Sequence, residues 1–198
     1  MKVVGITGGI GSGKSTLAKM FLNRGIPLYD SDSRAKSLMV ESAELRNSLV
    51  ELLGENTYLE DGSLNRAFVA SIIFTDKEKL QGVNSLVHPA VFKDFLLWKE
   101  SQTSPFVVKE SALLFENKSD EFCDKIILVT ADLELRIKRV MQRDGVSYNQ
   151  VVDRIKNQMS EEEKIKKADF VLYNDGGLEK LTTEFENLYH QLIESYVY

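Results

Sequence analysis

The sequence predicts an α/β fold in which helices cover both faces of a five-stranded parallel sheet. Two patterns predict this class. Short apolar runs alternate with segments of helical periodicity, and a glycine-rich loop joins the first apolar run to the first helical segment. Because the runs are short and almost wholly apolar, they are typical of strands buried on both faces. The expected strands are 3–6, 26–29, 106–108, 126–129 and 170–173.

The loop after the first expected strand has the pattern Gly-x4-Gly-Lys-Ser. Glycines let a backbone curl closely around an anion, and the next helix adds N–H groups and a positive dipole. We expect Lys14 to reach the β- and γ-phosphates of ATP and the Ser15 hydroxyl to bind Mg²⁺. A chance glycine-rich turn is the alternative, but the flanking strand and helix favour a phosphate site. The expected nucleotide-binding residues here are Gly8, Gly9, Gly11, Ser12, Gly13, Lys14, Ser15 and Thr16.

Two carboxylates follow the second expected strand, in the segment Asp30-Ser31-Asp32. Ligands of open α/β sheets bind at the carboxyl ends of the strands, which is the edge that carries the glycine loop. Asp30 and Asp32 are therefore candidate site residues. Aspartate and serine are also favoured at helix N-termini, so both residues can equally be caps of the next helix. Position alone does not decide between the two interpretations.

Residues 33–103 show helical periodicity without a strand pattern, which predicts a helical insertion between the second and third strands. We expect this subdomain to bind the second substrate. Within it, His88-Pro89 is predicted to open a helix, because proline is favoured at the first helical position. For His88 considered alone, a capping or core role is the simpler interpretation.

A basic segment follows the fourth strand and predicts a lid over residues 136–167. Arg136, Arg139 and Arg143 are spaced three and four residues apart, which puts them along one side of a helix. Arginines of a lid could close on ATP phosphates, whereas the plainer interpretation is a solvated charged face. With this lid, the single kinase domain of 1–198 has a core of 1–32, 104–135 and 168–198.

Glu110 follows the third expected strand and is a candidate acidic group near the metal. The alternative for Glu110 is a charge that faces solvent. Its position at the end of a parallel strand favours the site, because this edge of the sheet is where the glycine loop is expected.

Composition restricts the classes of partner. The chain has 198 residues and a net charge of −5, which argues against general nucleic-acid binding. Its single cysteine, Cys123, suits a reducing compartment, and no apolar run is long enough to span a membrane. We therefore expect a cytoplasmic protein that acts on small molecules, binds neither nucleic acid nor membrane, and is a monomer or a weak homo-oligomer.

These motifs together resemble the dephospho-coenzyme A kinase family over nearly the whole chain. The resemblance implies a P-loop core like that of the nucleoside monophosphate kinases, a helical substrate domain and a lid. It also implies ATP-dependent phosphorylation of the ribose 3'-hydroxyl of dephospho-CoA, the last step of coenzyme A synthesis. The matching segments are 5–16, Asp30-x-Asp32, Asp61-Gly62 with Arg66 and Phe74, Asn84 with His88-Pro89, 113–116, Arg139, 143–145, Arg154, Gln158, 168–169 and Asn174.

The resemblance also implies roles for individual residues. Asp32 would be the general base on the 3'-hydroxyl, with Asp30, Arg66, His88 and Pro89 on the dephospho-CoA side. Arg139 and Arg143 would stabilise the transferring phosphoryl group from the lid, and Asn174 would belong to the ATP side.

Two positions depart from the family pattern. Glu110-Ser111-Ala112 stands where the family has an acidic residue, any residue and proline, so the usual Asp and Pro are absent here. Ile165 stands where the family commonly has an arginine before Ala-Asp, and the neighbouring Lys166 and Lys167 do not inherit that role, because lysine lacks the planar fork of arginine.

Two rival functions remain at this point. One is another small-molecule kinase of the same fold, acting on a nucleotide or a sugar acid. The other is a nucleotide-dependent switch, for which 117–120 spells a guanine-reading motif. The Asp-x-x-Gly element that such switches also need occurs nowhere in the chain, which counts against the second rival.

Overall fold

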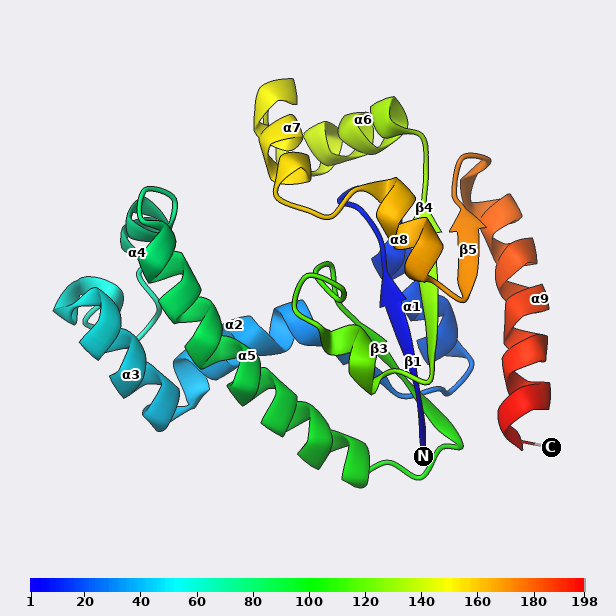
Figure 1. Cartoon of the computed structure of the whole chain (residues 1–198), viewed down its shortest axis with the longest axis horizontal. Coiled ribbons are helices and arrows are strands. Elements are labelled where there is room, and N and C mark those ends of the chain that lie inside the picture. The colour runs from blue at the N-terminus through cyan, green and yellow to red at the C-terminus, as the bar shows by residue number, and fades with distance from the viewer. Residues whose placement is uncertain (198) are drawn as a thin grey trace. The chain divides into compact units, whose positions relative to one another are not determined.

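A computed structural model of the chain describes residues 1–197, and its centre is a five-stranded parallel sheet in the order β2-β3-β1-β4-β5 (Figure 1). The predicted sheet is confirmed. Every observed strand overlaps a predicted run, and most extend it by one or two residues. The strands are β1 (Lys2–Thr7), β2 (Leu28–Asp30), β3 (Phe106–Glu110), β4 (Lys125–Thr130) and β5 (Phe170–Tyr173).

The chain divides into two compact units, one of residues 1–30 and 102–197 and one of residues 31–101. The first, which we call the sheet unit, holds α1 (Lys14–Asn23), α6 (Leu133–Asp144), α7 (Tyr148–Lys156), α8 (Glu161–Lys167), α9 (Gly177–Val197) and a 3₁₀ turn, η2 (Ser119–Phe122). The second, the helical unit, holds α2 (Ser31–Glu41), α3 (Ala43–Leu53), η1 (Glu55–Thr57), α4 (Arg66–Ile73) and α5 (Lys77–Glu100).

Both faces of the sheet are buried. On one face, α1 and α9 pack against the strands, with Phe21 of α1 edge-on to Phe185 of α9 at 4.9 Å between ring centroids. On the other, Ile126 of β4 packs with Leu114 and Phe115 from the segment after β3. Because β1 lies at the centre, its carboxyl end presents the glycine loop in the middle of the sheet edge.

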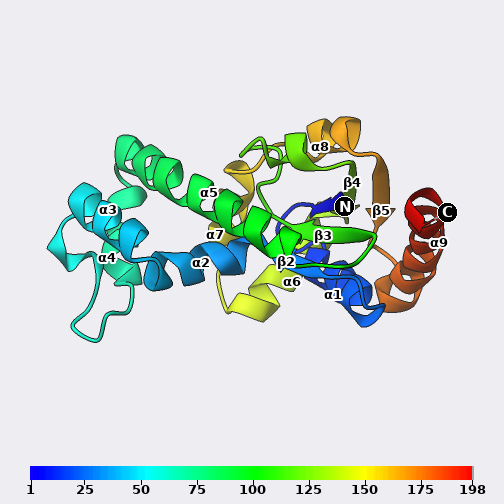
Figure 2. The same cartoon turned by 90° about the horizontal axis from the view of Figure 1, so that it is seen from below.

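In the helical unit, α5 packs against α2 and α3 (Figure 2). The prediction that His88-Pro89 opens a helix is wrong, because both residues lie inside α5. A proline inside a helix costs about 3 kcal/mol, since it removes one backbone hydrogen bond. Here buried valines continue the helical repeat on both sides of the proline, so packing of that face outweighs the lost bond. The repeat comprises Val83, Val87, Val91 and Phe95.

The predicted helices of 136–167 are confirmed as α6, α7 and α8. Ser147 and Ser160 cap α7 and α8 in reciprocal capping boxes with Gln150 and Glu163. Whether this segment moves as a lid stays a prediction. Within residues 1–197, no helix is long and apolar enough to cross a membrane.

Candidate active site

The glycine loop curls from the end of β1 into the N-terminus of α1. The Ser12 amide donates to the Gly9 carbonyl at 3.1 Å, which closes a tight turn. Gly13 then adopts φ 103° and precedes the first helical residue, Lys14. A side chain at Gly13 would be strained by this left-handed backbone, and its Cβ would lie 2.3 Å from Asn174 Nδ2. The loop geometry therefore depends on glycine at this position.

Asn174 fastens the loop to the end of β5. Its Nδ2 donates to the Ser12 carbonyl at 2.8 Å in a buried hydrogen bond. The backbone carbonyl of Asn174 accepts a hydrogen bond from Arg139 Nη2 at 2.9 Å. The structure thus brings the predicted residues Asn174 and Arg139 to the glycine loop, although they come from different elements.

A cavity of about 270 Å³ opens where the loop enters α1. The Lys14 ammonium lies over the loop, with its Nζ 3.0 Å from the Gly8 carbonyl and 3.4 Å from the Gly9 carbonyl. Positive charge from Lys14, two arginines and the helix dipole converges on this cavity, which therefore suits an anion. It is lined by Gly11, Gly13, Lys14, Ser15, Thr16, Arg139 and Arg143.

A second cavity, of about 230 Å³, adjoins the first and shares Gly13, Thr16 and Arg139 with it. Its further walls are Asn174 and the start of α9, where Leu178 is 64% exposed. Gly177 and Leu178 are not among the site residues predicted from the sequence. The signal was present, because they follow Asn174 after a strand that ends at the same sheet edge as β1.

Glu110 belongs to this site and does not face solvent. It is 7% exposed and accepts a hydrogen bond from the Ser15 hydroxyl at 3.1 Å. Asp30 is its register partner on β2, so a second carboxylate lies beside it. A hydroxyl and a carboxylate are suitable ligands for Mg²⁺, which usually takes few ligands from the protein and the rest from phosphates and water. Within residues 1–197, no group of three or more Asp, Glu, His or Cys side chains is arranged to hold a metal ion.

The three arginines of α6 have different surroundings. Arg136 is 4% exposed and donates to Glu161 Oε1 at 3.0 Å, so it is a buried structural residue and not part of a phosphate-facing row. Arg139 lines both cavities, and its Nη1 is buried without a hydrogen-bond partner among the described residues. That unsatisfied donor fits an anionic oxygen of a ligand.

Arg143 lines the larger of these two cavities but is paired with Asp144 through its Nε at 2.7 Å. Arg154 also donates to Asp144, at 2.9 Å. These hydrogen bonds, that from Arg143 first, lower the pKa of Asp144 to about 2. Arg143 therefore lines the cavity while the Asp144 carboxylate compensates part of its positive charge.

The predicted acceptor-side residues of the helical unit are spread along three helices. Asp32 is exposed in the first turn of α2, and Arg66 is exposed as the first residue of α4. His88 is half-buried within α5, and burial lowers its pKa. Pro89 lines a pocket of the helical unit.

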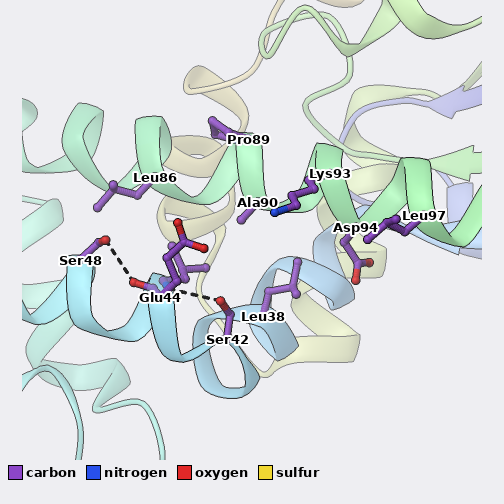
Figure 3. Close-up of a pocket in the computed structure, with 11 residues that line it drawn as sticks. Leu38, Ser42, Glu44, Ser48, Leu86, Pro89, Ala90, Lys93, Asp94 and Leu97 are labelled. Carbon is purple, nitrogen blue, oxygen red and sulfur yellow. Dashed lines mark hydrogen bonds between the residues drawn. The ribbon is translucent and has the colours of Figure 1, made fainter.

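This pocket, which we call the helical pocket, has a volume of about 390 Å³ and lies between α5 and the α2–α3 pair (Figure 3). Leucines such as Leu38 and Leu86 supply apolar walls. Figure 3 shows the Glu44 carboxylate and the Lys93 ammonium reaching into the space between the helices. The pocket can accordingly hold a ligand that carries both apolar and polar groups.

Known proteins that are similar to this chain in sequence or structure include dephospho-CoA kinases. The family model for dephospho-CoA kinase matches residues 2–180. A dephospho-CoA kinase of Salinibacter ruber is 41% identical over 192 residues, covering 96% of both chains. The structure of a dephospho-CoA kinase from Campylobacter jejuni is 27% identical with a TM-score of 0.71, covering 98% of this chain and 99% of that one. A Thermus thermophilus structure is 36% identical with a TM-score of 0.85, covering 96% and 97%. The chain belongs to the dephospho-CoA kinase family.

Proposed function

We propose that this enzyme transfers the γ-phosphoryl group of ATP to the ribose 3'-hydroxyl of dephospho-CoA. The observation that carries the proposal is the cationic cavity at the glycine loop, where Lys14, Arg139 and Arg143 converge at the N-terminus of α1. Membership of the dephospho-CoA kinase family supports the choice of acceptor.

The chain holds the phosphates by positioning and charge. Lys14 Nζ lies 3.0 Å from the Gly8 carbonyl, and its ammonium binds the β- and γ-phosphates. Ser15 and Glu110 are the residues that would hold Mg²⁺. When bound, this ion neutralises charge on the phosphates. Arg139 directs its unsatisfied buried nitrogen to a phosphate oxygen.

The smaller cavity suits the nucleoside end of ATP. It shares Gly13, Thr16 and Arg139 with the phosphate cavity, and Leu178 adds an apolar surface. The Arg139 guanidinium can stack on a flat base as well as bond to a phosphate, because it is planar and weakly hydrated. Asn174 keeps this wall in register with the loop through its bond to Ser12.

Asp32 is the general base for the acceptor hydroxyl. Asp32 is an exposed residue in the first turn of α2. A carboxylate within hydrogen-bond reach of the acceptor hydroxyl can take its proton. Asp30, Arg66 and His88 contribute to the acceptor side, and Pro89 does so through the helical pocket.

Arg143 stabilises the transferring phosphoryl group after exchanging Asp144 for a phosphate oxygen. In the described structure its guanidinium is bonded to Asp144, which Arg154 also holds. Arg154 can keep the Asp144 carboxylate compensated when Arg143 turns toward the nucleotide. Arg143 would then act as a charge that the lid brings to the phosphates.

A substrate panel tests this function directly. Release of ADP should be measured with dephospho-CoA, AMP and a sugar acid as acceptors at equal concentrations, and ³¹P NMR should identify the phosphorylated hydroxyl. We expect turnover with dephospho-CoA and a new phosphomonoester at the ribose 3' position. Turnover with AMP or the sugar acid but not with dephospho-CoA would refute the proposal. So would nucleotide binding without any acceptor phosphorylation.

A further inference from the structure

The segment that joins α7 to α8 contacts the glycine loop from the side. Gln158 in this segment accepts a hydrogen bond at its Oε1 from the Ile10 amide, at 3.0 Å. The bond spans 148 positions of the sequence. It holds the amide at the tip of the loop, between Gly9 and Gly11.

A second contact from the same region supports the neighbouring glycine. Glu161 accepts from Arg136 Nη1 at 3.0 Å and from the Thr130 hydroxyl at 2.5 Å. Arg136 lies directly against Gly9, because a Cβ built there would be 1.8 Å from Arg136 Nη1. The guanidinium is therefore clamped between Glu161 and the loop backbone, and only glycine leaves room for it.

We propose that Gln158 is a positioning residue for the phosphate-binding loop, acting through the Ile10 amide. This inference rests on the proposed function, since it assumes that the loop binds ATP phosphates. A peptide unit is planar, so holding the Ile10 N–H also fixes the orientation of the Gly9 carbonyl. That carbonyl accepts from Ser12 and from Lys14, which are both expected phosphate-binding residues.

The loop needs such support because it is rich in glycine. Gly9 and Gly11 flank Ile10 and restrict its backbone little, so the Gly9–Ile10 peptide unit depends on its hydrogen bonds, from Ser12 inside the loop and to Gln158 outside it. Donors that are already oriented bind an anion with less loss of conformational entropy. Gln158 supplies this order without touching the nucleotide, so its loss should weaken ATP binding and slow transfer while leaving acceptor recognition intact.

Glutamine has the chemistry that this position requires. Its side-chain oxygen accepts the Ile10 N–H, and the neutral amide adds no negative charge beside a polyphosphate. Methionine has a similar length but only a weak acceptor, so Gln158→Met removes the bond at nearly constant volume. Glutamate keeps the side-chain shape and an acceptor oxygen, so the Gln158→Glu variant should retain the hydrogen bond from the Ile10 amide.

The experiment compares full-length Gln158→Met with the wild type by titration with a non-hydrolysable ATP analogue, steady-state kinetics and the ¹H–¹⁵N resonance of Ile10. We expect the Kd for the analogue to rise about tenfold, which corresponds to about 1.4 kcal/mol. Turnover should fall by a similar factor of about ten, the KM for dephospho-CoA should stay unchanged, and the Ile10 amide proton should shift upfield. Gln142→Met, an exposed glutamine on α6, is the matched control and should match the wild type.

A Gln158→Met variant with an unchanged Ile10 resonance and unchanged nucleotide Kd would overturn the inference. If Gln158→Met proves unfolded by circular dichroism, Gln158→Glu provides the test. The Glu variant should keep the Ile10 resonance near its wild-type position, and loss of that resonance position would contradict the proposed bond. The titration and the resonance need no acceptor, so failure of the wild type to phosphorylate dephospho-CoA would count against the proposed function alone.

Discussion

The glycine loop and the helical pocket differ in how their walls are held. The loop donates hydrogen bonds to side chains at the end of β3 and in the α7–α8 segment, and it accepts one from a side chain after β5. Ser12 in the loop is fully buried. The helical pocket, in contrast, has Pro89 and Lys93 exposed on its wall, and Leu97 is 62% exposed.

We propose a division of labour between the two units that matches this difference. Electrostatic stabilisation of phosphoryl transfer needs groups that are oriented before the reaction, and the loop has that order. Recognition of a long acceptor can use exposed walls that adjust to the ligand. Changes near the loop should therefore act mainly on turnover and nucleotide affinity, whereas changes in the helical unit other than at the general base should act on acceptor affinity.

The largest effect is expected at Lys14, whose ammonium lies over the loop. Lys14→Ala removes the charge that would bind the β- and γ-phosphates and should lower turnover about a thousandfold or more. Steady-state ADP release with dephospho-CoA measures it. Lys19→Ala, an exposed lysine on the same helix, is the control and should keep wild-type turnover. An unchanged kcat in Lys14→Ala would remove this residue from the phosphate site.

The next largest effect is expected at Asp32, which tests whether phosphoryl transfer also depends on a residue of the helical unit. Asp32→Asn keeps the shape of the side chain but cannot accept the hydroxyl proton, so kcat should fall about a hundredfold. The Kd for an ATP analogue should change less than about twofold, because the variant acts after nucleotide binding. Glu51→Gln on α3 removes an exposed carboxylate from the same unit and should be silent. Near-wild-type turnover in Asp32→Asn would exclude Asp32 as the base.

Features formed by consecutive residues could be predicted from the sequence more readily than contacts between distant residues. The glycine loop was predictable because its donors are consecutive in the chain, and the strands because buried parallel strands are apolar throughout. Contacts between distant residues gave no local signal. The bond from Ile10 to Gln158 and the burial of Arg136 depend on how α6 and α8 pack on the loop.

At Pro89, a local residue preference led to a wrong prediction. Proline favours the start of a helix, yet α5 runs through it because apolar residues on both sides of it are buried. For Glu110, the position at a strand end was predictable but the burial was not, because the burial follows from Ser15 and the neighbouring strands.

A smaller effect is expected where β5 supports the loop. Asn174→Ala leaves the buried Ser12 carbonyl without its side-chain donor, which should cost about 1–3 kcal/mol of unfolding free energy. The Kd for an ATP analogue should rise about tenfold, because the loop loses the donor that holds the Ser12 carbonyl, whereas Arg139 keeps its bond to the Asn174 backbone carbonyl. Urea unfolding and nucleotide titration measure the two quantities, with the exposed Asn149→Ala on α7 as control. A stable variant with unchanged nucleotide affinity would show that the loop does not need this bond.

The smallest effect concerns pH and the helical unit. Burial lowers the pKa of His88, so the folded chain binds a proton there less readily than the unfolded chain, whose histidine pKa is about 6.5. The stability from keeping His88 neutral is complete above about pH 6.5 and is lost as the pH falls toward the lower folded pKa. The urea unfolding free energy of the wild type should therefore drop between about pH 7.5 and 5.5 by more than that of His88→Gln. His190→Gln, the other histidine, lies in α9 and should retain the wild-type drop. Equal drops in His88→Gln and the wild type would contradict the assignment of this pH dependence to His88.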